Sequence, residues 1–187
     1  MAENTYFTGV GDGGYTVIGD TKVKKSSPIA DAIGSIDELI SYLGVVQCGD
    51  ITDTIKGHIQ TIQDRLFAMN ADIAGIIDKR FVPKRPLGNS DIDTIESYIK
   101  AVGVGVPKLR LFVIPGGSRE SAELDFARSI SRRAERSFIV LYDTYGLDDN
   151  RFGASRRYLN RISSYLFWAA RYLNAERQVR ERNPGSD

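Results

Sequence analysis

The spacing of apolar residues constrains the fold of this 187-residue chain more than any other feature. Between positions 124 and 141 the apolar side chains recur every three or four residues: Leu124, Ala127, Ile130, Ala134, Phe138 and Leu141. This spacing puts them on one face of an α-helix, where they can pack against a core. The same pattern recurs along the chain and predicts helices over about 28–47, 51–78, 91–103, 119–145 and 150–174.

Capping residues mark where several of these helices begin and end. Ser27 followed by Pro28 is typical of a helix start, and Ser90 and Ser118 are expected to cap the third and fourth helices. Gly146 is expected to stop the fourth. The fold class that follows is all-α: a five-helix antiparallel bundle with an extended glycine-rich N-terminal loop.

The chain divides into three parts on this pattern. We expect residues 1–26, which lack helical periodicity, to form an extended functional loop, residues 27–174 to form the helical bundle, and residues 175–187 to form a polar tail. We expect the tail to fray or be disordered, as exposed termini commonly do. The apolar run at 109–114 looks like a strand without a partner, and we expect it to be a buried extended segment.

The bulk composition excludes several classes of protein. The length indicates one domain, and a formal net charge of +1 argues against a general nucleic-acid binder. Cys48 is the single cysteine and His58 the single histidine, so neither an internal disulfide nor a histidine-based metal site is expected. No apolar run approaches the roughly 20 residues that span a bilayer. We expect a cytoplasmic protein with no membrane partner.

A cationic stripe follows the fourth helix. Arg128, Arg132 and Arg136 stack on the face opposite the apolar one. Their guanidiniums repel one another unless an anion lies across them, and arginine can hold phosphate with two parallel donors. Glu135 lies in the same stripe, and the fifth helix carries a matching polar set that includes Asn160. The plainer alternative is a solvated helix face.

A glycine-rich loop at positions 9–16 offers backbone N–H groups that can wrap phosphates. It matches neither a Walker A loop nor a Rossmann fingerprint, and a plain turn is the alternative. Lys25 and other lysines follow closely and can add charge to a bound phosphate. Taken together, the loop and the arginine stripe indicate a polyphosphate site assembled from two distant parts of the chain.

Two further residues have open interpretations. Asp37 flanks the apolar face of the first helix, and it is either a solvated carboxylate or the partner of an arginine across an interface. Phe112 precedes the Pro115-Gly116-Gly117 turn and would by default belong to the core.

Several segments resemble the PduO-type ATP:corrinoid adenosyltransferases from about residue 6 to residue 174. The order and spacing of these segments make the resemblance specific. The segments are Gly11-Asp12-Gly-Gly-Tyr-Thr16, Ala32-Ile-Gly-Ser-Ile-Asp37-Glu38-Leu39, Phe112-Val-Ile-Pro115-Gly116-Gly117, Ala127-Arg128-Ser-Ile-Ser-Arg132-Arg133-Ala134-Glu135-Arg136 and Tyr158-Leu159-Asn160-Arg161-Ile-Ser163. One departure is Val10, which stands where the family usually has Thr, while Thr8 lies two residues earlier.

The resemblance implies a homotrimer that binds ATP at each subunit interface, between the N-terminal loop of one chain and the helices of the next. The implied reaction transfers the 5′-deoxyadenosyl group from ATP to cob(I)alamin and releases triphosphate, with Mg²⁺ required. The resemblance also implies a cobalamin reductase and an adenosylcobalamin-dependent enzyme as partners. The alternatives are a non-catalytic nucleotide-sensing helical bundle and a structural bundle with a solvated arginine face.

The resemblance also implies roles for individual residues. The phosphate-binding loop would consist of Gly11, Asp12, Gly14, Thr16 and Lys25. The ATP site on the helices would consist of Arg132, Glu135, Arg136 and Asn160, with both arginines acting in catalysis. Arg128 would pair with Asp37 across the interface, and Phe112 would keep the lower axial ligand off cobalt. No residue is assigned to a protein-held metal.

Overall fold

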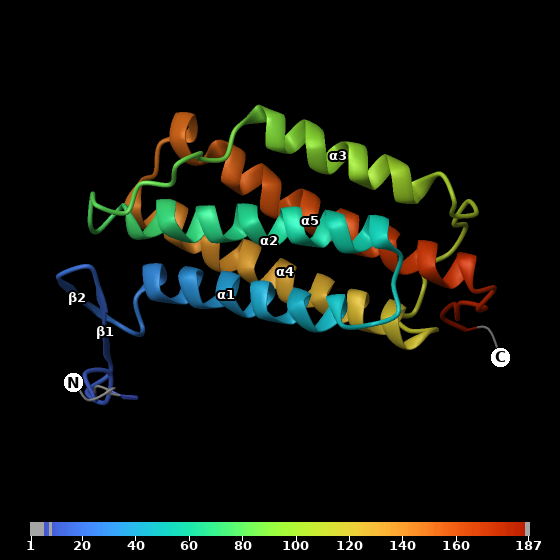
Figure 1. Cartoon of the computed structure of the whole chain (residues 1–187), viewed down its shortest axis with the longest axis horizontal. Coiled ribbons are helices and arrows are strands. Elements are labelled where there is room, and N and C mark those ends of the chain that lie inside the picture. The colour runs from blue at the N-terminus through green and yellow to red at the C-terminus, as the bar shows by residue number, and fades with distance from the viewer. Residues whose placement is uncertain (1–5, 8, 186–187) are drawn as a thin grey trace, which may run out of the picture.

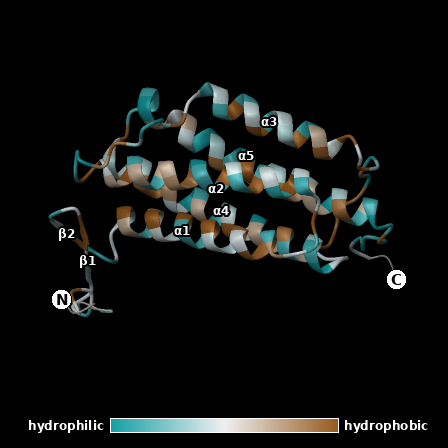
Figure 2. Cartoon of the chain, viewed as in Figure 1, coloured by the Kyte–Doolittle hydropathy of each residue, from teal (hydrophilic) through white to brown (hydrophobic). Residues whose placement is uncertain are grey.

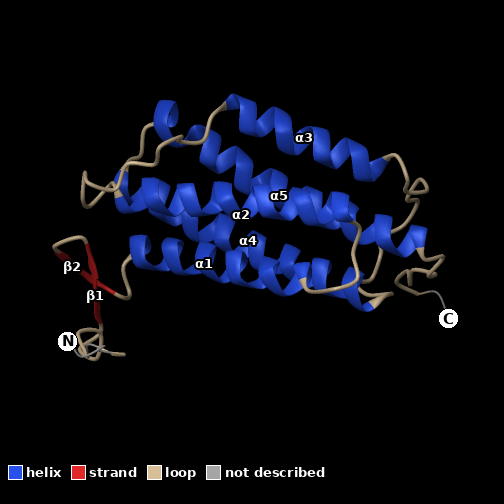
Figure 3. Ribbon diagram, in the orientation of Figure 1, coloured by secondary structure: helices blue, strands red, loops and turns tan. Residues whose placement is uncertain are grey.

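The computed structural model describes residues 6, 7 and 9–185, which form a helical bundle with a small β-hairpin at one end (Figure 1). The helices are α1 (Pro28–Gln47), α2 (Asp53–Ala74), α3 (Asn89–Gly103), α4 (Arg119–Tyr145) and α5 (Asp149–Glu176). The hairpin consists of β1 (Tyr15–Ile18) and β2 (Thr21–Lys24), which pair antiparallel (Figure 3). The all-α bundle expected from the sequence is confirmed.

Each helix runs opposite to the one before it in sequence (Figure 1). Helix α1 packs against α2 and α4, α4 packs against α5, and α5 also packs against α3, which runs in the same direction. The hairpin, the start of α1 and the α4–α5 turn lie at one end of the bundle, whereas the α3–α4 connection and the C-terminus lie at the other. None of the described helices combines the length and apolarity that a membrane span requires.

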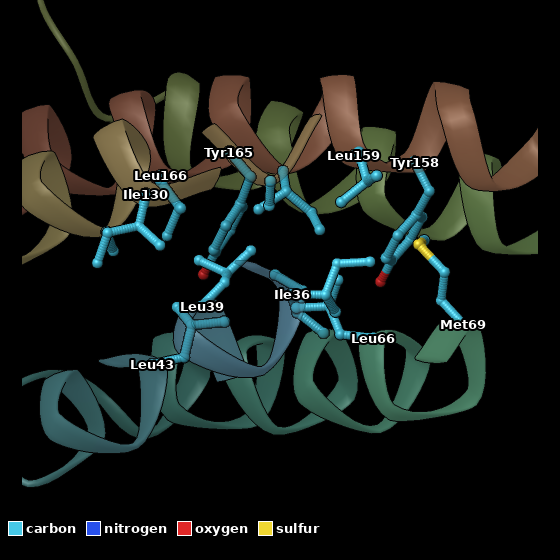
Figure 4. Close-up of a cluster of buried hydrophobic side chains, with 14 of the residues drawn as sticks. Ile36, Leu39, Leu43, Leu66, Met69, Ile130, Tyr158, Leu159, Tyr165 and Leu166 are labelled. Carbon is cyan, nitrogen blue, oxygen red and sulfur yellow. The ribbon is translucent and has the colours of Figure 1, made fainter. Parts of the chain in front are cut away.

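The core lies between the apolar faces of these helices. Brown and teal residues alternate along every helix, as expected of amphipathic helices around one core (Figure 2). Figure 4 shows the following side chains meeting between the helices, all of them buried: Ile36, Leu39, Leu43, Leu66, Met69, Ile130, Tyr158, Leu159, Tyr165 and Leu166. Burial raises the pKa of the Tyr165 phenol, whose hydroxyl lies 3.2 Å from His58 Nδ1.

The predicted caps of α1 and α4 are confirmed. The Ser27 hydroxyl accepts the N–H of Ala30, and the Ser118 hydroxyl accepts the N–H of Ser121 at 3.2 Å. Gly146 adopts the left-handed conformation at the C-terminus of α4. These caps depend only on local sequence, which explains why they could be predicted.

The start of α3 was predicted wrongly. Ser90 does not cap this helix, because Asn89 already belongs to it and Gly88 takes the cap position. The Asp91 carboxylate supplies the missing cap by accepting the N–H of Gly88 at 2.9 Å, and it also pairs with Arg65 of α2 at 3.1 Å. A tertiary ion pair therefore holds Asp91 in the place where it can cap the helix.

The boundaries of α2 and α5 also differ from prediction. Helix α2 ends at Ala74 rather than near residue 78, and α5 extends from Asp149 to Glu176, beyond the predicted end at residue 174. The N-terminal part is not wholly an extended loop, because residues 15–24 form the hairpin. The predicted loop includes residues 1–5 and Thr8, which lie outside the described residues.

Two expectations at the other end of the bundle were wrong. The segment 109–114 is extended but not buried, with Leu111 66% and Phe112 88% exposed. The tail does not fray over its described part, because the N–H of Ile114 donates to the Arg182 carbonyl at 2.8 Å. Residues 186–187 of the predicted tail lie outside the described residues. The buried core takes its side chains from the helices, the hairpin and the connections at Ile51 and Leu87, and none from this apolar run.

Candidate active site

The arginine stripe of α4 has the helical phase that the sequence predicts. The apolar residues on the opposite face, from Leu124 to Leu141, are buried, while Arg132 and Arg136 are exposed. Within the described part of the chain, neither Arg132 nor Arg136 has a hydrogen bond or ion pair. Arg133 differs, because its guanidinium pairs with Glu38 of α1. Two neighbouring arginines thus remain available for an anion.

Glu135 and Asn160 lie beside these arginines and join α4 to α5. The Asn160 amide donates to Glu135 Oε1 at 2.9 Å. Asn160 Oδ1 in turn accepts from Arg161, which pairs with Glu96 of α3 at 2.9 Å. This series of contacts across three helices fixes the direction of the Asn160 side chain. The structure therefore brings Arg132, Glu135, Arg136 and Asn160 together, because positions three and four apart are neighbours on a helix.

Arg128 lies one turn before Arg132 and is only 26% exposed. Its Nε is buried without a hydrogen-bond partner among the described residues and lies 3.8 Å from Asp125 Oδ1. Asp37 of α1 is exposed and forms no ion pair within the described chain. The predicted pairing of Arg128 with Asp37 is thus not made inside one chain.

The glycine-rich loop forms a tight turn before β1. The N–H of Gly14 donates to the Gly11 carbonyl, and the N–H of Lys25 donates to the Gly14 carbonyl at 3.0 Å. Gly14 has a φ of +79°, which an L side chain rarely adopts. A Cβ on Gly11 would lie 2.9 Å from the Lys25 Nζ, so the missing side chain lets the ammonium approach the loop.

A cavity of about 370 Å³ lies beside this turn and is lined in part by Gly11, Thr16 and Lys25. The structure therefore brings three of the predicted phosphate-binding residues together around one hollow. Asp12 and Gly14 belong to the turn itself, where Asp12 donates its N–H to the Gly9 carbonyl at 3.1 Å.

A second cavity, of about 480 Å³, separates the hairpin from α1 and α2. Asp37, Asn70, Thr16 and Lys25 are among the residues that line it. Sequence reasoning did not single out Asn70, whose Oδ1 is buried without a hydrogen-bond partner in the described chain. No local sequence motif marks Asn70. It lines a cavity only because the hairpin lies beside α1 and α2 in the folded chain.

Arg80 fastens the hairpin to the bundle, and this contact was also missed by sequence reasoning. Its guanidinium pairs with Asp20 in the hairpin turn at 2.6 Å and with Asp78 after α2 at 2.5 Å. Hydrogen bonds from Arg80 lower the pKa of Asp78 to about 2, so the carboxylate stays charged across the physiological range.

The loop and the arginine stripe do not meet within one chain. The hairpin lies beyond the end of the bundle at which α1 begins (Figure 1). Arg132 lies near the middle of α4, roughly 20 Å from the end of that helix nearest the hairpin at 1.5 Å per residue. The residues predicted for the two halves of a polyphosphate site therefore lie in two separate places within one chain.

Phe112 lies on the α3–α4 connection at the end of the bundle opposite the hairpin (Figure 1). Its high exposure contradicts the interpretation as a core residue. The turn that follows is well fixed: the N–H of Gly116 donates to Asp125 at 3.2 Å, and the Gly116 carbonyl accepts from Asn174 at 2.9 Å. A large aromatic ring is thus presented to solvent next to an anchored turn.

Comparison with known proteins identifies the family. A model of the cobalamin adenosyltransferase family matches residues 6–173. The chain is 34% identical to a corrinoid adenosyltransferase of Citrobacter freundii, covering 88% of this chain and 92% of that one. It is 36% identical to a corrinoid adenosyltransferase of Mycobacterium tuberculosis (strain H37Rv), covering 97% and 94%.

Solved structures agree with this assignment. A variant of the PduO-type ATP:corrinoid adenosyltransferase from Lactobacillus reuteri, complexed with cobalamin and ATP, superposes with a TM-score of 0.83 at 29% identity. The match covers 97% of both chains. The resemblance seen in the sequence is confirmed, and a non-catalytic nucleotide sensor is not favoured. This chain belongs to the cobalamin adenosyltransferase family and is a corrinoid adenosyltransferase of the PduO type.

Proposed function

We propose that the chain transfers the 5′-deoxyadenosyl group of ATP to cob(I)alamin in sites shared between neighbouring chains of a homotrimer. The cobalt(I) electron pair attacks C5′, a cobalt–carbon bond forms, and the C5′–oxygen bond breaks. Its electron pair leaves with inorganic triphosphate, and the corrinoid becomes adenosylcobalamin. The observation that carries this proposal is the pair of unpartnered arginines, Arg132 and Arg136, beside the Glu135–Asn160 hydrogen bond in the described chain.

The main demand of this reaction is stabilisation of the leaving triphosphate. Cobalt(I) is itself the nucleophile, so no general base is needed. Arg132 and Arg136 are exposed one helical turn apart, and both can donate to the same polyphosphate as negative charge develops on it. Glu135 keeps Asn160 directed at this face, where the amide can contact the nucleoside part of ATP.

The glycine-rich loop would hold the phosphates from the other side. The N–H groups of Gly11 and Gly13 donate no hydrogen bond within the described chain, so they are available to phosphate oxygens. Thr16 and Lys25 line the same hollow and add a hydroxyl and a positive charge. Asp12 and Gly14 keep the turn in shape.

We expect Mg²⁺ to enter with ATP rather than in a site of its own. The described residues contain no group of three or more His, Cys, Asp or Glu side chains that could hold a metal ion. Mg²⁺ commonly keeps several waters and binds substrate phosphates with few protein ligands, and this arrangement fits such a site.

The separation of the two half-sites supports an assembly in which neighbouring chains share each site, and the homotrimer is our proposal for that assembly. A loop at one end of the bundle can reach the middle of α4 only in a neighbouring chain, and a closed ring supplies every loop with such a neighbour. The buried Nε of Arg128, without a hydrogen bond in the described chain, is accounted for if Asp37 of the neighbour reaches it.

Phe112 would act on the corrinoid rather than on ATP. An exposed ring can stand where the lower axial ligand of cobalamin would otherwise bind, and four-coordinate cobalt(II) is easier to reduce. A cobalamin reductase and an adenosylcobalamin-dependent enzyme as partners, and a cytoplasmic location, stay predictions.

The test is to mix the protein with ATP, Mg²⁺ and chemically reduced cobalamin and to measure light-sensitive adenosylcobalamin. Arg132→Ala and Arg136→Ala should each lower turnover on the order of 10²-fold, by analogy with a lost oxyanion donor. Arg133→Ala is the matched control, because Glu38 already occupies that guanidinium. Equal losses at all three positions would contradict the assigned roles, and ATP binding without any turnover would favour a nucleotide sensor.

A further inference from the structure

The segment that carries Phe112 is poorly supported by packing. A cavity of about 380 Å³ lies between this segment, α5 and the C-terminal tail, with Leu109, Leu111, Val113 and Val179 among its lining residues. The Phe112 ring itself is almost fully exposed. Apolar contacts therefore do not determine where the ring stands, and its position depends on the hydrogen bonds of the segment.

Two of those hydrogen bonds link the segment to the C-terminal tail. The N–H of Ile114 donates to the carbonyl of Arg182 at 2.8 Å, in an antiparallel bridge. The Asn183 side chain donates through Nδ2 to the carbonyl of Phe112, also at 2.8 Å. The tail thus contacts the backbone at Phe112 itself and again two residues later.

The tail is fastened to the bundle through Glu181. Its carboxylate pairs with the guanidinium of Arg171 and accepts from the Asn174 amide at 3.0 Å. Arg171 is 1% exposed, and its other face is bound by Asp125 of α4 at 2.6 Å. One buried guanidinium therefore joins α4 to the tail, and it keeps the Asp125 partner when Glu181 is removed.

We propose that residues 178–183 position Phe112 for catalysis and that Glu181 is the anchoring residue of this tail. The inference rests on the proposed role of Phe112 at the corrinoid. Glu181 itself need not touch a substrate: it holds the tail, and the tail holds the Phe112 backbone. If the Phe112 ring loses its position, the lower base of cobalamin should be able to bind cobalt. Cobinamide lacks this tethered base, so the same change should affect it less.

The experiment compares Glu181→Ala with Arg180→Ala, the matched control in the same tail. Arg180 is exposed and has no hydrogen bond or ion pair in the described chain. Glu181→Ala should lower turnover with cobalamin about tenfold, since a small misplacement of a catalytic group can cost this much. Turnover with cobinamide and the KM for ATP should stay near wild type, and Arg180→Ala should resemble wild type throughout.

Asn183→Ala provides a second route if Glu181→Ala folds poorly, because it removes the contact to the Phe112 carbonyl and leaves Glu181 in place. Asn183→Ala should likewise lower turnover with cobalamin more than turnover with cobinamide. Equal losses on both corrinoids, or a raised KM for ATP, would show that the tail contributes only to general structure and would overturn the proposal.

Phe112→Ala separates this inference from the one on which it rests. If Phe112→Ala does not reduce turnover with cobalamin more than with cobinamide, the proposed role of Phe112 is wrong. If Phe112→Ala reduces turnover with cobalamin more than with cobinamide but Glu181→Ala and Asn183→Ala do not, the proposed role of the tail is wrong. If the tail acts through Phe112, adding Glu181→Ala to Phe112→Ala should cause no further loss.

Discussion

Mixing two impaired variants tests whether the active site is divided between chains. Lys25→Ala damages the loop, where the ammonium lies against Gly11 beside the phosphate hollow. Arg132→Ala damages the helix face near the middle of α4. Each variant alone should lose on the order of 10²-fold in turnover, because each removes a cation from the leaving triphosphate.

The expected recovery follows from how shared sites combine. When equal amounts of the two variants assemble together, half of the intact loops have an intact helix face as their neighbour, and half of all loops are intact. About a quarter of the sites in a closed ring therefore contain both halves undamaged. The mixture should reach about a quarter of wild-type turnover, well above either variant alone.

The assay is co-refolding of the two variants, followed by measurement of adenosylcobalamin formation from ATP and reduced cobalamin. A mixture of Arg132→Ala with Arg136→Ala is the control, since both changes lie on α4 and no assembly can restore that face. If the loop and helix variants together do no better than each alone, loop and helix act within one chain and the shared site is refuted. Recovery in the control mixture would equally contradict the reasoning.

Three further predictions concern assembly and stability. Asp37→Asn and Arg128→Lys should each weaken ATP binding or assembly, by about 3–5 kcal/mol if the pair is buried between chains. The double variant should lose less than the sum of the two single losses. Additive losses in light scattering and ATP titration would show that the two side chains do not touch. Burial lowers the pKa of His58 below 6.5, so the unfolded chain binds this proton more tightly. The free energy of unfolding should therefore fall as the pH drops below about 6.5, and urea titrations should show this dependence weakened in His58→Gln. Arg171→Leu should destabilise the fold by about 3–5 kcal/mol, because Asp125 is 2% exposed and would lose its closest cation; a loss under about 1 kcal/mol in urea unfolding would argue against this.

The local sequence predicted the helices most accurately where their ends depend on neighbours in the chain. Helix α4 begins after Ser118 and ends before Gly146, as expected, because a serine cap and a left-handed glycine act within a few residues. Ser90 failed as a cap because Asp91, held by Arg65 of another helix, performs that function. The sequence does not show which of two adjacent polar residues a distant arginine will bind.

In the candidate site, too, some features could be predicted from the local sequence and others depended on tertiary contacts. Helical periodicity alone placed Arg132 and Arg136 on the exposed face of α4, and glycine content alone drew attention to the loop that we propose binds phosphate. Tertiary contacts decided which arginines are paired: within the described chain Glu38 binds Arg133, whereas Arg132 and Arg136 have no ion pair.

The end of the molecule that carries Phe112 shows what only the tertiary structure decides. The mostly apolar run at 109–114 has the composition of a buried segment, and the charged tail has that of a frayed one. Burial, however, depends on tertiary packing, and none of the buried core residues comes from this run. The order of the tail likewise depends on Arg171, a buried cation that pairs with Glu181, ten residues along the chain. Periodicity and capping act over a few residues and can be read from the chain, whereas the pairing of charges and the closure of a core require the whole fold.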